Sequence, residues 1–270
     1  MINAGNNAQI PAGLTTDQLG SVHTRIFGAN VDIGAYEVQP TSVTVEKAVG
    51  QADPAMTGPI LFDVVFEVPV TGFTSSDVTL NSTVGGTVTI SGSGDTYQIF
   101  VNGMFGSGTV SVSIPANVAF DGSLTGNLAS TSIDNSVQFD NTAPTVTIEK
   151  ATTPLQADPT NNPTIVFDVT FNEAVSGFDA SDVVTTGSTV TFSSKTVFQV
   201  DSSHYRVTFL ANPGQTGDLV VAVPAGAAID VPGNPSLAAT STDNSVHFDD
   251  VRPTVTVNQA VGQSDTCLLY

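Results

Sequence analysis

The sequence contains no tryptophan, a single cysteine, and six lysine and arginine residues among 270. Cys267 has no partner within the chain for a disulfide, so the fold must form without that cross-link. The chain also lacks an apolar run of the roughly 18 residues that a membrane-spanning helix needs, and we expect no direct membrane insertion. Its first residues have neither the charged region nor the apolar region of a secretory signal peptide.

The scarcity of basic residues leaves the chain strongly acidic. The 25 aspartates and glutamates give a formal net charge of −19. Such a surface repels nucleic acid and anionic lipid, so we expect neither as a direct partner. Acidic residues without neutralising cations suit either a solvated, salt-tolerant surface or the binding of divalent cations.

The apolar residues that are present have the composition of β-strands. Valine, isoleucine, leucine and phenylalanine alternate with threonine and serine. No long stretch has the apolar period of about 3.6 residues that marks a helix. The composition therefore predicts an all-β protein.

An internal repeat organises the chain. Ser42–Ala48 returns as Thr145–Ala151 and again as Thr254–Ala260, with 103 residues from Val43 to Val146 and 109 from Val146 to Val255. This period matches one whole small β-domain. Each copy is followed by a second shared motif, at Gln51–Pro54, Gln156–Pro159 and Gln263–Asp265. We expect complete modules at 40–141 and 142–250, and a truncated start of a third at 251–270.

The first module reads as about seven strands joined by short turns, which predicts a two-sheet sandwich. The strongest expected strand is 60–68, with Phe62, Val64 and Phe66 on one face. A hairpin is expected between 86–90 and 96–100. The second module repeats the order, and Asp230 through Gly233-Asn234 is matched to Asp121 through Gly126-Asn127. The other expected strands of the first module are 42–45, 76–80, 108–114 and 135–140.

These motifs resemble a known family. The order P-T-V-T, Q-A-D-P, F-D-V-x-F, G-F-x-x-S-D-V, D-x-x-G-N and D-N-S-V-x-F-D is similar to bacterial Ig-like repeats, which occur in tandem in large secreted surface and adhesin-type proteins. The resemblance covers about residues 40–250 and part of 251–265. It implies β-sandwich modules that space or display other domains. The cysteine pair and tryptophan of antibody domains are missing, so only the general sandwich is expected.

Residues 1–39 do not belong to the repeat. Leu14–Gly20 followed by Val31–Glu37 resembles the closing turn of secreted bacterial right-handed parallel β-helix proteins of the pectate-lyase type. Two positions depart from that pattern, with Asn3 where aspartate is usual and Leu19 where arginine is usual. A coil of this kind buries its core only against the coil before it. We therefore expect a remnant of a β-helix end, with any enzyme activity in coils upstream.

No catalytic constellation is evident in the modules. Alternation places Asp63 and Asp168 on the outward faces of their strands, so the pairs Asp63/Glu67 and Asp168/Glu173 read as solvated carboxylates. His23, His204 and His247 lack metal-ligand spacing to one another or to cysteine, which excludes a zinc motif. We expect no enzyme.

Calcium is the one ionic hypothesis that the sequence supports. Acidic and amide residues stand at the expected module ends, before Pro144 and Pro253. Calcium takes roughly 6–8 oxygen ligands, which such residues offer. The alternative is that aspartate and asparagine cap strands and bend turns. The candidate ligands of a junction site are Asp140, Asn141, Asp179, Asp182, Asp230, Asp249 and Asp250.

The leading functional hypothesis is a non-catalytic stalk or display fragment of an extracellular, cell-surface bacterial protein. Short linkers predict a monomeric, semi-rigid rod, and the partners would be other surface proteins or glycans. The alternative is an accessory region of a carbohydrate-active β-helix enzyme. Glycan binding by the modules themselves would call for exposed aromatic residues grouped on one face, whereas most aromatic residues here fall at core positions.

Overall fold

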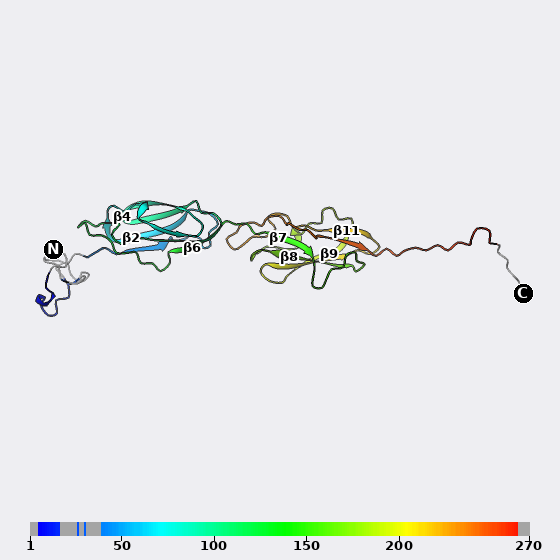
Figure 1. The fold of residues 1–270 in the computed structure, drawn as a ribbon, viewed down its shortest axis with the longest axis horizontal. Coiled ribbons are helices and arrows are strands. Elements are labelled where there is room, and N and C mark those ends of the chain that lie inside the picture. Colours follow the sequence, from blue (N-terminus) through cyan, green and yellow to red (C-terminus); the bar gives the residue numbers. More distant parts are fainter. Residues whose placement is uncertain (1–4, 17–25, 27–29, 31–38, 264–270) are drawn as a thin grey trace. The chain divides into compact units, whose positions relative to one another are not determined.

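The computed structural model describes residues 5–16, 26, 30 and 39–263. The chain divides into two compact units, Met1–Thr142 with Pro232–Asn234, and Ala143–Val231 with Pro235–Tyr270 (Figure 1). Among the described residues no helix is long and apolar enough to cross a membrane. We call the sandwich of the first unit module 1 and that of the second unit module 2, and describe each by itself.

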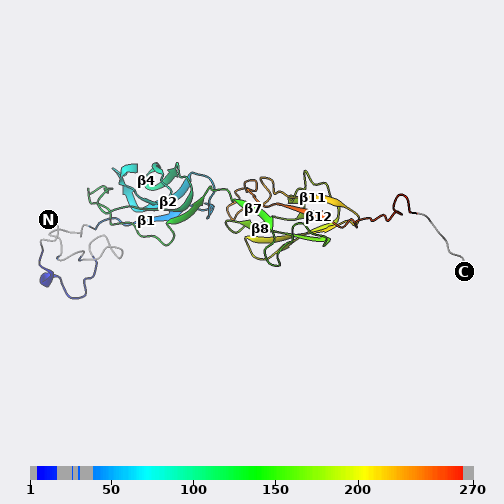
Figure 2. The same ribbon diagram turned by 45° about the vertical axis from the view of Figure 1, so that its right-hand side comes forward.

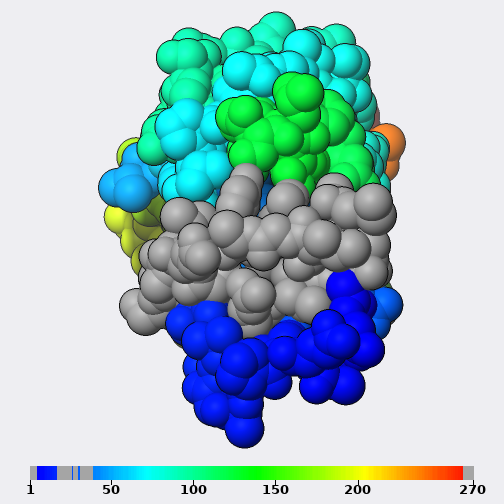
Figure 3. Space-filling view, turned by 90° about the vertical axis from the view of Figure 1, so that its left-hand side faces the viewer, coloured from blue at the N-terminus to red at the C-terminus, as the bar shows by residue number. Residues whose placement is uncertain are grey.

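The amino-terminal segment shows no β-helix in its described part. Residues 5–16, blue in Figure 3, contain one short 3-10 helix, η1 (Asn7–Gln9). The side chain of Asn6 caps this helix by accepting from the Ala8 amide at 3.0 Å. The expected β-helix remnant is therefore not seen in residues 5–16. Its more specific motif, Val31–Glu37, lies outside the described residues and stays a prediction.

Module 1 is built from two antiparallel sheets. One has the order β1-β2-β4 and the other β3-β5-β6, an arrangement consistent with an Ig-like sandwich. The expected strong strand is confirmed as β2, in which Phe62, Val64 and Phe66 are buried and the residues between them are not. The elements are β1 (Val43–Lys47), β2 (Ile60–Val70), η2 (Ser75–Asp77), β3 (Thr79–Ser82), β4 (Thr87–Asn102), β5 (Ser107–Ser113) and β6 (Ser136–Asp140).

Strand β4 folds back on itself. The Thr87 hydroxyl donates to the Asn102 carbonyl at 3.4 Å, and Gly92 lies against the backbone of Thr96 and Tyr97. Its two arms are the two expected strands 86–90 and 96–100, so the hairpin prediction is confirmed. The second arm pairs with β2, with Tyr97 opposite Val64.

The core of module 1 lies between the sheets. Phe62 and Ile99 come from the first sheet, and Val112 and Phe139 from the second, and all four belong to one cluster of buried side chains. Burying a side chain of this size contributes about 1.5–3 kcal/mol relative to leaving it in water. Alternation of apolar and polar residues along each strand is thus sufficient to explain the sandwich.

Module 2 repeats this plan with one sheet of the order β7-β8-β10-β9 and a second of β11-β12. Where module 1 has β3, module 2 has only an isolated bridge between Val184 and Ala222. Its core joins Phe167 and Phe209 with Leu219 and Phe248. The elements are β7 (Val146–Lys150), β8 (Thr164–Phe171), η3 (Ala180–Asp182), β9 (Phe192–Gln199), β10 (His204–Ala211), β11 (Thr216–Val220) and β12 (Ser245–Asp249).

Two details of the sequence interpretation are wrong. The expected strand 76–80 begins as η2, because the Thr74 amide donates to the Asp77 carboxylate at 2.7 Å and this capping box holds a helical turn. The second concerns the match between Asn127 and Asn234. An isolated β-bridge pairs Phe120 with Gly126 in module 1, and the corresponding bridge of module 2 pairs Ile229 with Pro235. Gly126 therefore corresponds to Pro235. The next residue, Asn127, corresponds to Ser236 and not to Asn234.

Residues 251–263 form no strand, although they contain the third copy of the repeat. Val255 and Val257 are 85% and 91% exposed. Cys267 and its neighbours lie outside the described residues.

Candidate functional site

The first strand of module 1 is held on both edges. One edge of β1 pairs with β2, and the other takes the segment that leads into β6. The Val45 amide donates to the Thr131 carbonyl at 3.1 Å, and the Thr131 amide donates to the Val43 carbonyl at 3.0 Å. Because Thr44 and Thr131 lie on parallel segments, the chain enters the module at one end and leaves it at the other (Figure 2).

Module 2 repeats this parallel pairing. The Thr240 amide donates to the Val146 carbonyl at 3.1 Å, and the Ile148 amide donates to the Ser241 hydroxyl at 2.9 Å. The Lys150 amide then donates to the Asp243 carbonyl at 2.9 Å. In both modules the entering strand is therefore bonded along its length to the segment before the departing strand.

A charged group reinforces each pairing; we call it the terminal clasp. In module 1 the Lys47 ammonium lies 2.9 Å from the carboxylates of both Asp53 and Asp134. In module 2 the Lys150 ammonium lies 2.7 Å from the carboxylates of both Asp158 and Asp243. Each lysine thus ties the first strand to the turn that follows it and to the segment before the last strand.

The glutamate before each lysine adds to the clasp from the same strand. The Glu46 carboxylate accepts from the amides of Ile133 and Asp134 at 2.9 and 2.7 Å. The Glu149 carboxylate accepts from the amides of Thr242 and Asp243 at 2.9 and 2.6 Å. Hydrogen bonds to a charged acceptor are roughly twice as strong as those between neutral groups.

The clasp shifts the ionisation of its members. The Ile133 and Asp134 amides hold the pKa of Glu46 below its usual value. Hydrogen bonds from Lys150 and then from the His247 amide lower the pKa of Asp158. The partner carboxylates raise the pKa of Lys47 and of Lys150. For Asp53, burial raises the pKa, but Lys47 and the Gln138 amide outweigh it and the net shift is downward.

The glutamine of the second shared motif, Q-A-D-P, adds one more hydrogen bond beside each clasp. The Gln51 side-chain carbonyl accepts from the Leu61 amide, and that of Gln156 accepts from the Val166 amide, each at 2.9 Å. The sequence shows these residues only as repeat markers and assigns them no role. The signal in the sequence that could have revealed the clasp is that the motifs E-K-A, Q-A-D-P and D-N-S recur together in both modules. In the structure these three motifs meet at one place in each module.

The outward carboxylates of the sheets have cross-strand partners. Asp63 accepts from the Gln98 amide group at 2.8 Å, and Asp168 accepts from the Arg206 guanidinium at 2.9 Å. Each pair lies directly opposite in the register of two neighbouring strands. These partners give both carboxylates a structural role in the sheet face.

The proposed calcium ligands at the module ends make local turns. Asp140 accepts from the Thr142 amide at 2.9 Å, and Asp249 accepts from the Val251 amide at 3.0 Å. One residue later, the Asn141 side chain accepts from the Gly106 amide and Asp250 from the Gly214 and Gln215 amides, all at 2.8 Å.

The remaining proposed ligands lie in loops of module 2. Asp179 caps η3 by accepting from the Ser181 amide at 2.6 Å, and Asp182 accepts from the Asp179 amide at 2.8 Å. Asp230 follows Ile229 and is 4% exposed. The turn-forming alternative thus explains most of these side chains, while the junction calcium site stays a prediction.

Comparison with known proteins places part of the chain in a family. No curated protein matches it. One matching solved structure, a chimeric titin Z1Z2 functionalised with a KLER peptide from decorin, is 12% identical; the match covers 76% of this chain and 99% of that one, with a TM-score of 0.24. Residues 140–248, which hold β7 to β11 and most of β12, match the family of bacterial Ig-like domains. This part of the chain is therefore a bacterial Ig-like domain.

Proposed function

We propose that the chain is a non-catalytic spacer of a secreted bacterial cell-surface protein of the adhesin type, and that its modules transmit tension. Bacterial Ig-like domains are typical of surface-exposed bacterial proteins. The observation that carries the proposal is the terminal clasp, which both modules build from the residues that define the repeat.

The clasp resists the load that a spacer experiences. Force applied through the two ends of a module pulls β1 or β7 along the parallel segment beside it. The hydrogen bonds between the two are then sheared together instead of being opened one at a time. The lysine and glutamate of each clasp add charge-assisted bonds at the same place. Resistance of this kind is governed by the unfolding rate under force.

Single-molecule stretching of the tethered chain tests the proposal. We expect two unfolding events, each releasing about 330–360 Å of chain for about 100 residues. Lys150→Met should lower the force of one event and leave the other unchanged. The matched control is Arg206→Gln, which also removes one positive charge but reproduces the Asp63–Gln98 pair of module 1. The proposal fails if Lys150→Met leaves both forces unchanged.

Polysaccharide binding distinguishes the alternative role. An accessory region of a carbohydrate-active enzyme should be retained on the polymer that the enzyme acts on, whereas a spacer should not. Retention of the chain on insoluble polysaccharides, competed by the soluble polymer, would favour the accessory role over the spacer.

Calcium binding at the module ends is a separate proposal. Thermal unfolding in EDTA and in millimolar calcium tests it, because a ligand at 100 times its dissociation constant adds about 2.7 kcal/mol per site. For a domain of about 100 residues this raises the midpoint by roughly 10 °C or more. An equal midpoint in both conditions, or the same rise with magnesium, would contradict a calcium-specific site.

A further inference from the structure

Strand β9 leaves one of its edges open. It is the last strand of its sheet, and among the described strands it pairs only with β10. The Val200 amide donates to the His204 carbonyl at 2.8 Å. Because bonded and non-bonded positions alternate in an antiparallel pair, the amides and carbonyls of Val197 and Gln199 point away from β10. These main-chain groups face the open edge.

The other outer strands of module 2 are covered. The free edge of β7 takes Thr240–Asp243, as described above, and that of β12 takes Thr160, whose amide donates to the His247 carbonyl at 2.9 Å. Val184 and Thr189 bond to β11 and the residues after it. Within the described part of module 2, β9 is thus the outer strand with an uncovered edge.

The open edge carries an exposed aromatic side chain. Val197 packs against the core, and side chains alternate along a strand, so the ring of Phe198 points to the outward face of the sheet. Phe198 is 69% exposed, and Val200, on the same face, is 58% exposed. Apolar residues exposed on a free strand edge favour pairing with a further strand.

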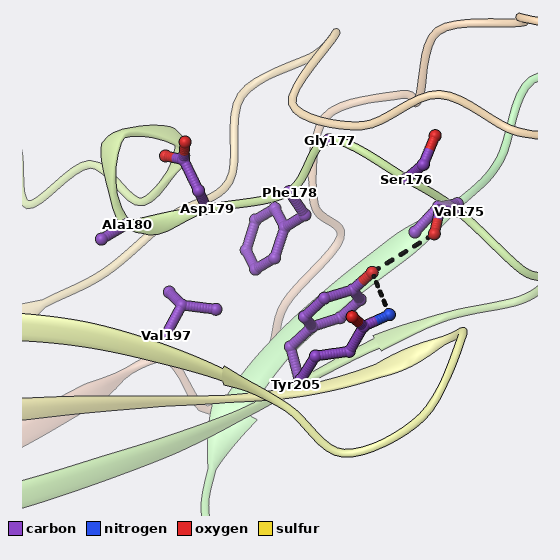
Figure 4. A pocket seen from close by; sticks show the side chains of 9 residues that line it. Val175, Ser176, Gly177, Phe178, Asp179, Ala180, Val197 and Tyr205 are labelled. Carbon is purple, nitrogen blue, oxygen red and sulfur yellow. Dashed lines mark hydrogen bonds between the residues drawn. The ribbon is translucent and has the colours of Figure 1, made fainter.

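A pocket of about 430 Å³ lies beside this edge. Val197 and Gln199 of β9 form one side, and Phe178 of the loop before η3 forms another. Phe178, Val197 and Tyr205 point towards one another (Figure 4). The Tyr205 hydroxyl accepts from the Gln199 amide group at 3.2 Å and so holds this side chain in place. The pocket leaves room for an inward-pointing side chain of an added strand.

Module 1 does not repeat this edge. Gly92 lies against Tyr97, in the place that Gln199 takes in module 2. Ser91, the residue before Gly92, stands where module 2 has Phe198. A Cβ atom at Gly92 would collide with the opposite arm of the hairpin, so no side chain fits there. The exposed ring and the pocket wall are therefore features of module 2.

We propose that β9 of one copy of this chain pairs with β9 of a second copy as antiparallel strands, across a twofold axis at Phe198. Such a contact is isologous, because the same surface serves both copies. Val197 of each copy then lies opposite Gln199 of the other, and each of these pairs exchanges both of its main-chain hydrogen bonds. The groups that face the open edge are thereby satisfied, and each Val197 side chain lies at the pocket of the other copy.

Charge complementarity selects this register. Lys195 is the basic residue of β9, and Asp201 is the acidic residue just beyond its end. An axis at Phe198 places Lys195 of each copy opposite Asp201 of the other, whereas an axis at Lys195 would place two positive charges opposite each other. Opposite charges across a strand pair stabilise it, and like charges destabilise it.

The aromatic ring favours the same axis. Phe198 meets Phe198 of the second copy at a non-bonded position, where facing side chains approach most closely. Aromatic pairs at such positions stabilise a sheet. An axis one residue earlier, at Val197, would place each ring opposite Thr196 and leave both rings without an apolar partner.

The contact is short, because Lys195 also limits it. The Lys195 ammonium points inward and donates to the Val183 carbonyl. Inward-pointing charges hinder strand pairing, so the paired segment runs from Thr196 to Val200 in each copy. Contacts this small are typical of weak association, and we expect a dimer that forms at about millimolar concentration. This inference goes beyond the spacer function, and it replaces the monomeric state that the sequence alone predicts.

Sedimentation of the full chain between micromolar and millimolar concentration tests the proposal. We expect the mass of the wild-type protein to rise to that of a dimer and to stop there, because an isologous contact closes. Phe198→Lys and Phe198→Glu each place like charges opposite each other and should weaken association by about tenfold or more. An equimolar mixture of the two variants should associate more strongly than either alone, because a lysine then faces a glutamate.

Disulfide trapping tests the register itself. In a chain that carries Cys267→Ser, Phe198→Cys should give a disulfide-linked dimer in oxidised glutathione. The Cα atoms of a non-bonded antiparallel pair lie about 4.5 Å apart, within the range of about 4.4–6.8 Å that a disulfide spans. Thr196→Cys in the same background lies opposite Val200 of the second copy and should remain unlinked.

A matched control keeps the test specific. Leu210 lies on the outward face of β10, outside the paired segment, and is 42% exposed. Leu210→Lys therefore makes a similar change one strand away from the edge and should leave association unchanged. Circular dichroism checks that all variants fold.

Three results would overturn the proposal. The first is a wild-type protein that stays monomeric at millimolar concentration, which would leave the edge to an extended segment of another protein. The second is a mixture of Phe198→Lys and Phe198→Glu that associates no better than either variant. The third is equal disulfide formation by Phe198→Cys and Thr196→Cys.

Discussion

A buried amide side chain shows how much one residue can organise. Asn127 is 1% exposed, and its side chain makes four hydrogen bonds. Its side-chain carbonyl accepts from the Val118 and Ala119 amides, both at 2.9 Å. Its amide group donates to the carbonyls of Pro115 and Leu128 at 2.9 and 2.6 Å. This single side chain therefore provides hydrogen-bond partners for four backbone groups of a loop that belongs to neither sheet.

The equivalent residue of module 2 does less. The Ser236 hydroxyl accepts one bond, from the Ala228 amide at 3.2 Å. We expect Asn127→Ala to cost about 2–4 kcal/mol, because it leaves several buried backbone groups unpaired, and Ser236→Ala to cost about 1 kcal/mol. Denaturant unfolding of the two variants measures both values. Equal losses would show that the loop of module 1 finds other partners.

Residue identities in the core could be predicted, while these loop partners could not. Alternation alone is enough to bury Phe62, Val64 and Phe66. The match of Asn127 to Asn234 rests on a Gly-Asn pair in each of the two loops. The β-bridges Phe120–Gly126 and Ile229–Pro235 show instead that Asn127 corresponds to Ser236. A loop has no periodicity, so sequence gives its composition but not which backbone groups it must satisfy.

At the scale of the element, the β4 hairpin depends on a close approach of its two arms. Gly92 has a φ of +121°, and a Cβ atom there would lie 2.7 Å from the Tyr97 Cα atom. The hairpin was predicted from its glycines and alternation. For the expected strand 76–80 only the start is wrong, because side-chain capping by Asp77 holds η2 there and β3 begins at Thr79.

Two glycine substitutions separate strain from collision. Gly50 has a φ of +84°, and a Cβ atom at this position would have no neighbour within 4 Å, so Gly50→Ala should cost about 1 kcal/mol from backbone strain alone. Gly92→Ala adds a collision with the opposite arm and should cost about 2–4 kcal/mol. Thermal and denaturant unfolding compare them. A Gly92→Ala cost no larger than that of Gly50→Ala would show that the arms can separate.

At the scale of the whole molecule, comparing the two modules separates the contacts that both form from those that one module forms. The clasp recurs in both modules and accounts for the repeat motifs. Module 2 departs from module 1 at Gln199, which lies opposite Tyr205 in β10, whereas Gly92 lies against Tyr97 in module 1. The sequence predicted strands, modules and acidic turns, but the clasp joins residues about 90 positions apart, as in the 88 that separate Asp134 from Glu46. Such a distance in sequence carries no local pattern from which the contact could be inferred.

The clasps predict a broad plateau of stability against pH. The pKa values of Glu46, Asp53 and Asp158 are lowered in the folded state. Their contribution is therefore complete above the unfolded value of about 4 and is lost as the pH falls through the folded values. The pKa values of Lys47 and Lys150 are raised. Their contribution is complete below about pH 10 and is lost as the pH rises through the folded values.

We therefore expect the free energy of unfolding to be nearly constant between about pH 5 and pH 10 and to fall on both sides. The pKa of Asp201 lies at about 2 because the Ser203 amide and His204 bond to its carboxylate. The contribution of Asp201 to the free energy of unfolding is therefore lost only as the pH falls towards that value. Lys150→Met should reduce the loss of unfolding free energy at both low and high pH. At low pH, Asp158 then keeps only the His247 amide as its main stabilising partner. At high pH, the lysine whose pKa is raised is no longer present. Denaturant unfolding across the pH range measures this. A wild-type stability that rises between pH 5 and pH 3 would mean that the clasp carboxylates are not charged partners in the folded protein, since their loss of charge must otherwise weaken it.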